Sequence, residues 1–169
     1  GNPAIGVSLA GKTVCISGAG NVGTTVGKIC EALGMSVVYF KRGDNLIEKA
    51  RGADVIVDAL GANEETEKIY NKDFFQALKR GAYFVTVTGD RLWDIDAMLE
   101  ALDRGTLAGV ATDVGNIQVG TVDNPMYQRF ANHPKVYATP HIAYNSDRGD
   151  MVCNDMMIGN IETWIRGKK

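Results

Sequence analysis

The stretch "TVCISGAGNVGTTVGKICEALG", residues 13–34, is the most informative part of this chain about its fold. It opens with a short apolar run that predicts a buried strand, and it continues into apolar residues at helical spacing. The pattern G-x-G-x-x-G stands between the two, at Gly18, Gly20 and Gly23. A strand, a glycine-rich turn and a helix in this order are typical of the first unit of a dinucleotide-binding fold.

Each glycine has a separate role in such a turn. Gly18 allows the tight turn, Gly20 lets the backbone approach a pyrophosphate, and Gly23 allows the helix to pack closely on the strand. The free N–H groups around Asn21 and Val22, together with the helix dipole, attract phosphate oxygens. We therefore predict a dinucleotide site here; a tight turn without a ligand is the alternative.

Outward from this stretch, strand-length apolar runs alternate with helical patterns. Because the runs are continuous and do not alternate with polar residues, they are typical of strands buried on both faces of a parallel sheet. We predict a single α/β domain, a doubly wound parallel sheet (Rossmann fold) in three layers, α/β/α, with strand order 3-2-1-4-5-6. The predicted strands are 13–17, 36–40, 54–60, 83–87, 108–114 and 135–139, and the helical patterns are 21–33, 74–80 and 95–105.

The remaining segments are assigned around this domain. Residues 1–10 are interpreted as a linker or an artificial remnant of expression, and residues 11–169 as the dinucleotide-binding domain. Residues 114–134 are predicted to form a long irregular connection, a kind of loop that is often functional. The segment 145–169 carries apolar side chains at helical spacing. We expect this stripe to join the core, the alternative being a partner outside the chain.

Composition excludes several classes of function. The chain has 169 residues, 45% of them hydrophobic, which is enough for one substantial core. Its 18 basic and 20 acidic residues leave a net charge of −2, so neither nucleic acid nor a membrane surface is expected as a partner. No apolar run approaches the about 20 residues that cross a bilayer, and we expect a cytoplasmic protein. The three widely spaced cysteines predict reduced thiols and no metal site.

The end of the second predicted strand favours a phosphorylated cofactor. This fold normally places Asp or Glu there to bind the adenosine ribose, but the sequence has Lys41 and Arg42. Two cations attract a 2′-phosphate and leave no acceptor for a 2′-hydroxyl. We predict NADP ahead of NAD. In the alternative, both cations are solvated and Asp44 acts as the acidic residue.

From Gly11 onward, the order of motifs resembles the NAD-binding domain of the D-isomer-specific 2-hydroxyacid dehydrogenases, the family of D-lactate dehydrogenase, phosphoglycerate dehydrogenase and glyoxylate reductase. The resemblance covers most of the chain. The motifs that carry it are "GKTVCISGAGNVG", "EALGMSVVYF", "ADVIVDAL", "NEETEKIYNKDFFQALKRGAYFVTV", "LWDIDAMLEALDRGTLAGVATDV" and "HPKVYATPHIAYNS".

The resemblance implies an oxidoreductase that transfers a hydride between a nicotinamide cofactor and a D-2-hydroxy acid or 2-oxo acid. Family members pair this domain with a second domain that completes the substrate cleft. The resemblance therefore implies that this chain is the cofactor domain without its substrate domain, inactive alone, and that it forms a homodimer. A non-catalytic homologue that senses a cofactor or binds a partner is the alternative.

The resemblance also assigns residues to the chemistry. It implies that His141, in the pair Pro140-His141, is catalytic and exchanges a proton with the substrate oxygen. Gln118 stands where the family usually has the carboxylate that orients this histidine. Gly89 stands where the family has an Arg that binds the substrate carboxylate, and Arg91 is a candidate replacement two residues on. The further cofactor contacts expected by position are Leu60, Gly61, Val87, Thr88, Gly89, Asp113, His141, Ala143 and Tyr144.

Overall fold

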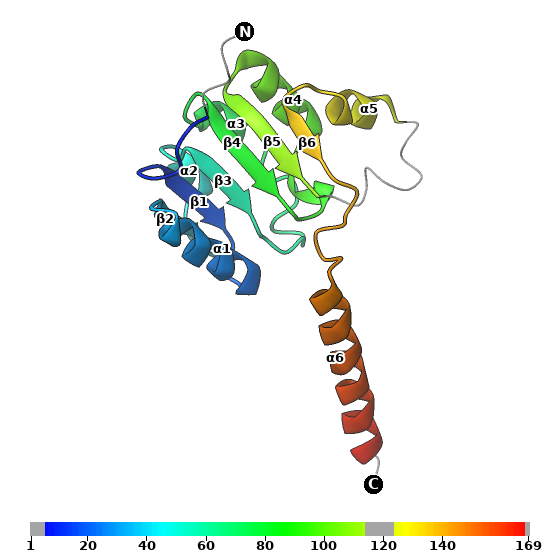
Figure 1. Ribbon diagram of the computed structural model, residues 1–169. Helices are drawn as coiled ribbons and strands as arrows, with labels where there is room; N and C mark the ends of the chain where they lie inside the picture. Colours follow the sequence, from blue (N-terminus) through cyan, green and yellow to red (C-terminus); the bar gives the residue numbers. More distant parts are fainter. Residues whose placement is uncertain (1–5, 114–123, 168–169) are drawn as a thin grey trace.

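The computed structural model describes residues 6–113 and 124–167 and contains one sheet of six parallel strands (Figure 1). Each apolar run that predicted a strand forms one, within two residues at either end, which confirms the α/β class. The strands are β1 (Thr13–Ser17), β2 (Ser36–Phe40), β3 (Val55–Asp58), β4 (Ala82–Thr86), β5 (Leu107–Thr112) and β6 (Val136–Ala138).

The order of the strands is β2-β1-β3-β4-β5-β6, so the predicted order 3-2-1-4-5-6 is wrong. The third strand pairs with β1, with Val14 opposite Val55, and does not lie beyond β2. Burial explains this choice. Ile56 is fully buried and Val57 is 9% exposed in β3, whereas three of the five residues of β2 are only half-buried. The more apolar strand therefore occupies the interior of the sheet, and β2 forms its edge.

The helices divide unequally between the two faces of the sheet. The step from β1 to β2 runs in one direction and all later steps run in the other, so right-handed crossovers place α1 on one face and α2 to α5 on the opposite face (Figure 1). The helices are α1 (Asn21–Ala32), α2 (Leu46–Ala50), α3 (Lys72–Ala77), α4 (Ile95–Arg104), α5 (Pro125–Ala131) and α6 (Asp147–Arg166), with a 3₁₀ helix η1 (Asp90–Leu92).

Most of the core lies between the sheet and α2 to α5. Tyr70, Phe74, Phe75 and Phe84 are all at most 1% exposed there and meet edge to face, with ring centroids 5.0 to 5.7 Å apart. Such contacts add to the burial of apolar area. On the other face, α1 covers a smaller cluster around Val14, Ile16, Met35 and Val57.

The helix α5 lies within the segment 114–134 that was predicted to be irregular, and this prediction is wrong for residues 125–131. Its beginning is encoded locally. The Asn124 side chain accepts a hydrogen bond from the N–H of Met126, and Pro125 occupies the first helical turn, where its missing N–H costs nothing. Phe130 then anchors the helix in the core, fully buried and tilted against Trp93.

Part of the sheet face beside α1 is exposed in the described structure. Tyr83 is 45% exposed and Tyr137 is 72% exposed on that face. A cavity of about 540 Å³ lies there between the sheet, α1 and the segment before β1. Its apolar lining includes Val7, Leu9, Val14, Cys30, Leu33, Met35, Val55, Tyr83 and Val85.

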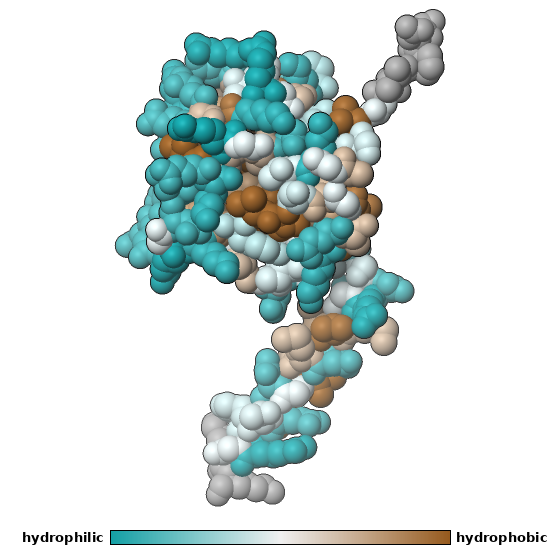
Figure 2. Space-filling view, turned by 90° about the vertical axis from the view of Figure 1, so that its left-hand side faces the viewer, coloured by the Kyte–Doolittle hydropathy of each residue, from teal (hydrophilic) through white to brown (hydrophobic). Residues whose placement is uncertain are grey.

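The helix α6 projects away from the sheet, with none of its residues buried (Figure 1). The prediction that its apolar stripe joins the core is therefore wrong for the described structure. Figure 2 shows apolar side chains exposed along α6 and on the body of the domain. The stripe gives α6 an apolar face that is suited to burial, but the described residues do not cover it. The exposed apolar side chains of α6 are Met151, Val152, Met156, Met157, Ile158, Ile161, Trp164 and Ile165.

Candidate dinucleotide and catalytic site

The candidate site lies at the carboxyl edge of the sheet. Because the strands are parallel, the segments that follow their carboxyl ends meet at this edge. The chain changes direction between β1 and β3, and doubly wound sheets bind their ligands outside such a switch point. The glycine turn stands there, directly after β1.

The three glycines meet different surroundings. A Cβ on Gly18, whose φ is +98°, would lie 2.6 Å from the Ala59 carbonyl oxygen, and a Cβ on Gly23 would lie 1.9 Å from the Gly18 carbonyl oxygen. A Cβ on Gly20 would meet nothing within 4 Å. The fold itself thus requires Gly18 and Gly23, whereas the space over Gly20 is open to a ligand.

The first turn of α1 offers its N–H groups to this open space. Gly20 is the N-cap residue, and within the described residues no side chain caps the helix. Asn21 and Val22 are exposed. Unpaired N–H groups at the positive end of a helix suit a phosphate, so the cradle fits the pyrophosphate of a dinucleotide.

A pocket of about 370 Å³, here called the β2–β3 pocket, lies beside the cradle. It brings together three of the expected cofactor contacts, Arg42 after β2 and Leu60 and Gly61 after β3. Lys41 is exposed next to it. The residues that line the pocket are Phe40, Arg42, Gly43, Leu60, Gly61, Asn63, Glu65, Thr66 and Ile69.

A buried carboxylate, Asp58, holds the edge together beneath the site. It is the last residue of β3 and is fully buried. Its oxygens accept hydrogen bonds from the Tyr70 hydroxyl (3.0 Å), the Thr86 hydroxyl (2.9 Å), the Leu60 N–H (3.1 Å) and the Thr88 hydroxyl. Burial raises the pKa of Asp58, and these hydrogen bonds only partly oppose the rise. The sequence analysis missed this residue because it lies inside an apolar run.

We predict that Asp58→Asn lowers the free energy of unfolding by about 2 kcal/mol at pH 4, because the amide NH₂ brings two donors to a site where a protonated carboxyl brings one. The folded protein binds the Asp58 proton more tightly than the unfolded chain, whose pKa is ordinary. The stabilisation by Asp58 is therefore complete at low pH and falls as pH rises through the raised pKa. Urea unfolding from pH 4 upward should show that the difference in the free energy of unfolding between the two proteins shrinks as pH rises. An exposed substitution, Asp155→Asn, is the control, and parallel curves for Asp58→Asn would contradict the prediction.

The turn after β6 carries His141, Ala143 and Tyr144, and all three are exposed. His141 has φ +51°, a left-handed conformation that costs a non-glycine residue on the order of 1 kcal/mol. Its N–H donates to the Thr139 carbonyl oxygen (3.0 Å), and its ring meets Tyr144 edge to face with centroids 5.4 Å apart. The imidazole is therefore exposed at the carboxyl edge of the sheet.

Asp113, at the end of β5, maintains this turn. Its two oxygens accept hydrogen bonds from the N–H groups of Ile142 (2.9 Å) and Ala143 (2.7 Å) and from the Thr139 hydroxyl. Burial acts to raise the pKa of Asp113, but the donors from Thr139, Ile142 and Ala143 outweigh it and hold the pKa below its ordinary value. The carboxylate therefore fixes the backbone of Ile142 and Ala143, and with it the left-handed conformation of His141.

The segment after β4 has no cationic side chain at the position the resemblance singles out. Gly89 is exposed, with φ −68° and nothing within 4 Å of a Cβ, so the backbone does not require glycine there. Arg91 follows on η1, and its guanidinium lies 3.4 Å from the Glu67 carboxylate. Val87 is exposed, while the Thr88 hydroxyl is turned toward Asp58. Gln118 lies outside the described residues.

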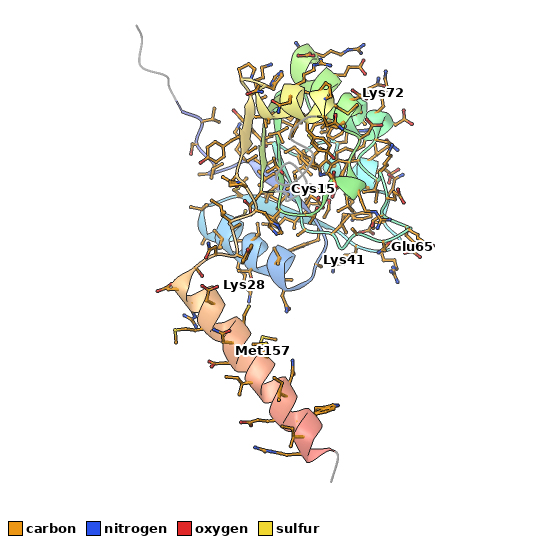
Figure 3. All side chains as sticks on the ribbon, turned by 90° about the vertical axis from the view of Figure 1, so that its right-hand side faces the viewer. Cys15, Lys28, Lys41, Glu65, Lys72 and Met157 are labelled. Atoms are coloured by element: carbon orange, nitrogen blue, oxygen red, sulfur yellow. The ribbon has the colours of Figure 1, made fainter. Side chains whose placement is uncertain are left out.

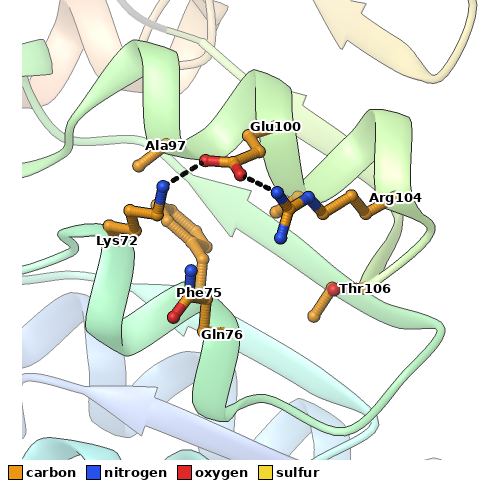
Figure 4. A pocket seen from close by; sticks show the side chains of 8 residues that line it. Lys72, Phe75, Gln76, Ala97, Glu100, Arg104 and Thr106 are labelled. Carbon is orange, nitrogen blue, oxygen red and sulfur yellow. Dashed lines mark ion pairs between the residues drawn. The ribbon is translucent and has the colours of Figure 1, made fainter.

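A smaller cavity, of about 180 Å³, lies away from this edge between α3 and α4 (Figure 4). Glu100 pairs there with Lys72 (3.0 Å) and Arg104, and the Lys72 hydrogen bond is the main cause that lowers the pKa of Glu100. Its charges are thus already compensated. Within residues 6–113 and 124–167, no cluster of His, Cys, Asp and Glu suits a metal ion, and no helix is long and apolar enough for a membrane span.

Comparison with known proteins identifies related chains. The profile of a family described as "D-isomer specific 2-hydroxyacid dehydrogenase, NAD binding domain" matches residues 2–143. The D-lactate dehydrogenase of Streptococcus agalactiae is 29% identical over 166 residues, covering 86% of this chain and 50% of that protein. The D-3-phosphoglycerate dehydrogenase of Bacillus subtilis is 30% identical over 160 residues, covering 87% of this chain and 30% of that protein.

A solved structure has the same architecture. D-2-hydroxyisocaproate dehydrogenase matches with a TM-score of 0.78 and 27% identity, covering 88% of this chain and 51% of that one. The chain spans about half the length of the first curated relatives that it matches.

Proposed function

The chain belongs to the family of NAD-binding domains of D-isomer specific 2-hydroxyacid dehydrogenases, and on this premise we propose that it is the cofactor domain of an oxidoreductase. The reaction is hydride transfer between a nicotinamide cofactor and a D-2-hydroxy acid or its 2-oxo acid. One observation carries the proposal: the glycine cradle and His141 stand at the same carboxyl edge of one parallel sheet.

Different residues of the carboxyl edge bind different parts of the cofactor in this proposal. The N–H groups at the start of α1 hold the pyrophosphate over Gly20, and the β2–β3 pocket holds the adenosine end. A nicotinamide cofactor held there would supply or accept the hydride. Asp58 contributes indirectly, because it fixes the ends of β3 and β4 on which the cofactor rests.

His141 handles the proton. Its imidazole gives a proton to the carbonyl oxygen of a 2-oxo acid during reduction and takes it back during oxidation. Asp113 assists by holding the turn that presents the ring. The role of Gln118 as the residue that orients His141 stays a prediction.

The substrate cleft needs groups beyond those of this edge. We propose that a second domain forms its other wall, since the chain spans about half the length of its relatives. Gly89 offers no cation for a substrate carboxylate. That anchor must come from the second domain or from Arg91, after release from Glu67.

We propose NADP(H) ahead of NAD(H) as the cofactor. Lys41 and Arg42 follow β2 beside the β2–β3 pocket, and both are exposed. A 2′-phosphate gains charge-assisted hydrogen bonds from such cations, and a 2′-hydroxyl does not.

The test is a turnover and binding assay. The complete gene product is expected to oxidise NADPH in the presence of a small 2-oxo acid. By cofactor fluorescence, it should bind NADPH about threefold or more tightly than NADH. Binding without any turnover would favour a non-catalytic homologue, for which the missing Arg at Gly89 is the supporting observation. Tighter binding of NADH would overturn the cofactor preference.

We also propose that two copies associate through this domain. The exposed sheet face around Tyr83 and Tyr137 and the unpartnered stripe of α6 are apolar surfaces of the kind that mark protein interfaces. Light scattering at micromolar concentration should give the mass of two chains, and the mass of one chain would contradict the proposal.

A further inference from the structure

A carboxylate faces the predicted cofactor-selecting cation across the β2–β3 pocket. Glu65 Oε2 lies 3.2 Å from Arg42 Nη2, and the two side chains are 74% and 86% exposed. Both residues line the pocket. Figure 3 shows Lys41 and Glu65 toward the same side of the domain, with Met157 of α6 far from both.

The backbone that carries Glu65 is fixed by its neighbours. The Asn63 side chain accepts hydrogen bonds from the N–H groups of Glu65 (2.8 Å) and Thr66 (3.1 Å). The Thr66 hydroxyl donates to the Gly61 carbonyl oxygen (2.9 Å), which ties the turn to the end of β3. The backbone that carries Glu65 is therefore a hydrogen-bonded turn, and this turn places the carboxylate at the pocket.

Other carboxylates nearby are committed elsewhere. Asp44, the alternative acidic residue, accepts the Lys41 N–H (3.0 Å) and lies 3.9 Å from the Lys49 ammonium, within its own turn. Asp58 is buried beneath the edge. Among the described residues that line the β2–β3 pocket, Glu65 is the one carboxylate.

We propose that Glu65 is a specificity-determining residue that restrains the binding of NADPH and supports the binding of NADH. This inference rests on the proposed function, since it requires a nicotinamide dinucleotide in the cradle. A 2′-phosphate must displace Glu65 from Arg42 and then lie beside a like charge. A 2′-hydroxyl, in contrast, donates a hydrogen bond to the carboxylate. The acidic group that is absent from the end of β2 is thus supplied from the turn after β3.

The test is Glu65→Gln, with dissociation constants for NADPH and NADH measured by cofactor fluorescence. We expect NADPH to bind about tenfold more tightly, the size that removal of one like charge beside an exposed phosphate suggests. NADH should bind about threefold more weakly, because an amide is a poorer acceptor than a carboxylate. The gain for NADPH should shrink at high salt, since exposed charges are screened.

Three further variants separate this role from a general change of charge. Glu64→Gln alters the neighbouring carboxylate, which is exposed and does not line the pocket, and it should leave both constants within about twofold. When Glu65→Gln is made together with Arg42→Gln, the gain for NADPH should be smaller than in the Arg42 protein, because the release of Arg42 from Glu65 no longer contributes. Arg42→Gln alone completes the double-mutant cycle, which gives the coupling between the two side chains.

The outcomes distinguish the inference from its premise. If the wild-type protein binds dinucleotides but Glu65→Gln leaves the ratio of the two constants unchanged, the role of Glu65 is wrong and the proposed function stands. An equal shift in Glu64→Gln also overturns the role of Glu65. If the wild-type protein prefers NADH and Glu65→Gln still shifts the ratio toward NADPH, only the cofactor preference fails. Absence of binding to either nucleotide overturns both.

Discussion

Replacing His141 by asparagine is expected to lower the turnover number of the complete gene product by about a thousandfold, within the range typical of a lost general acid. The dissociation constant of the cofactor should change by less than about threefold, because the N–H cradle and the β2–β3 pocket stay intact. Stopped-flow and steady-state assays of NADPH oxidation with a saturating 2-oxo acid, combined with fluorescence titration, measure both quantities.

The chain provides a matched control for this substitution. Its other histidine, His133, precedes β6 and therefore lies at the opposite, amino edge of the sheet. There its ring bonds with Asp103 (3.3 Å) and accepts the Lys135 N–H (3.2 Å). His133→Asn should keep turnover within about twofold of the wild type. Equal loss in both variants, or none in His141→Asn, would refute the catalytic role of His141.

Gly23→Ala and Gly20→Ala are expected to have large effects of different kinds. The new Cβ at position 23 lies 1.9 Å from the backbone oxygen of Gly18, so α1 must move off β1. We expect a loss of about 3 kcal/mol or more in the free energy of unfolding, with cofactor binding lost as well. Gly20→Ala meets nothing within 4 Å, and its stability should stay within about 1 kcal/mol of the wild type.

Cofactor affinity distinguishes Gly20→Ala from Gly23→Ala, because only Gly20→Ala should lose affinity while the protein stays stable. Gly20→Ala should weaken dinucleotide binding by about a hundredfold, because its methyl group fills the open space over the first turn of α1. Urea unfolding and fluorescence titration on the same samples compare stability with affinity. A stable Gly20→Ala protein with unchanged affinity would show that no phosphate approaches this turn.

The sequence predicted the local elements well because they depend on local chemistry. All six described strands were predicted from apolar runs, and the end of α4 at Gly105, with φ +73°, follows from the glycine after "LDR". The start of α5 at Asn124-Pro125 also carries a local signal, a capping side chain followed by proline in the first turn. Asp58 could also have been found, since Thr86 and Thr88 end the neighbouring strand at the same edge.

The sequence could not predict which surfaces pack against each other. The run at 54–60 fits a position beyond β2 as well as one beside β1, and only packing against both neighbours decides between them. The stripe of α6 specifies that a face should be buried, not which surface buries it. Glu65 reaches Arg42 through a turn whose shape depends on Asn63 and Thr66, and periodicity carries no information about such a meeting.

The hydrogen bonds of Asp113 connect two strands of the sheet, because they run from the end of β5 to the turn after β6. Because Asp113 joins the turn of His141 to the end of β5, that turn is held by the same sheet that carries the glycine turn after β1. Under the proposed function, a substitution in the second domain would leave both groups of this edge in place. Substrate preference and reaction type would then be set by separate parts of the protein.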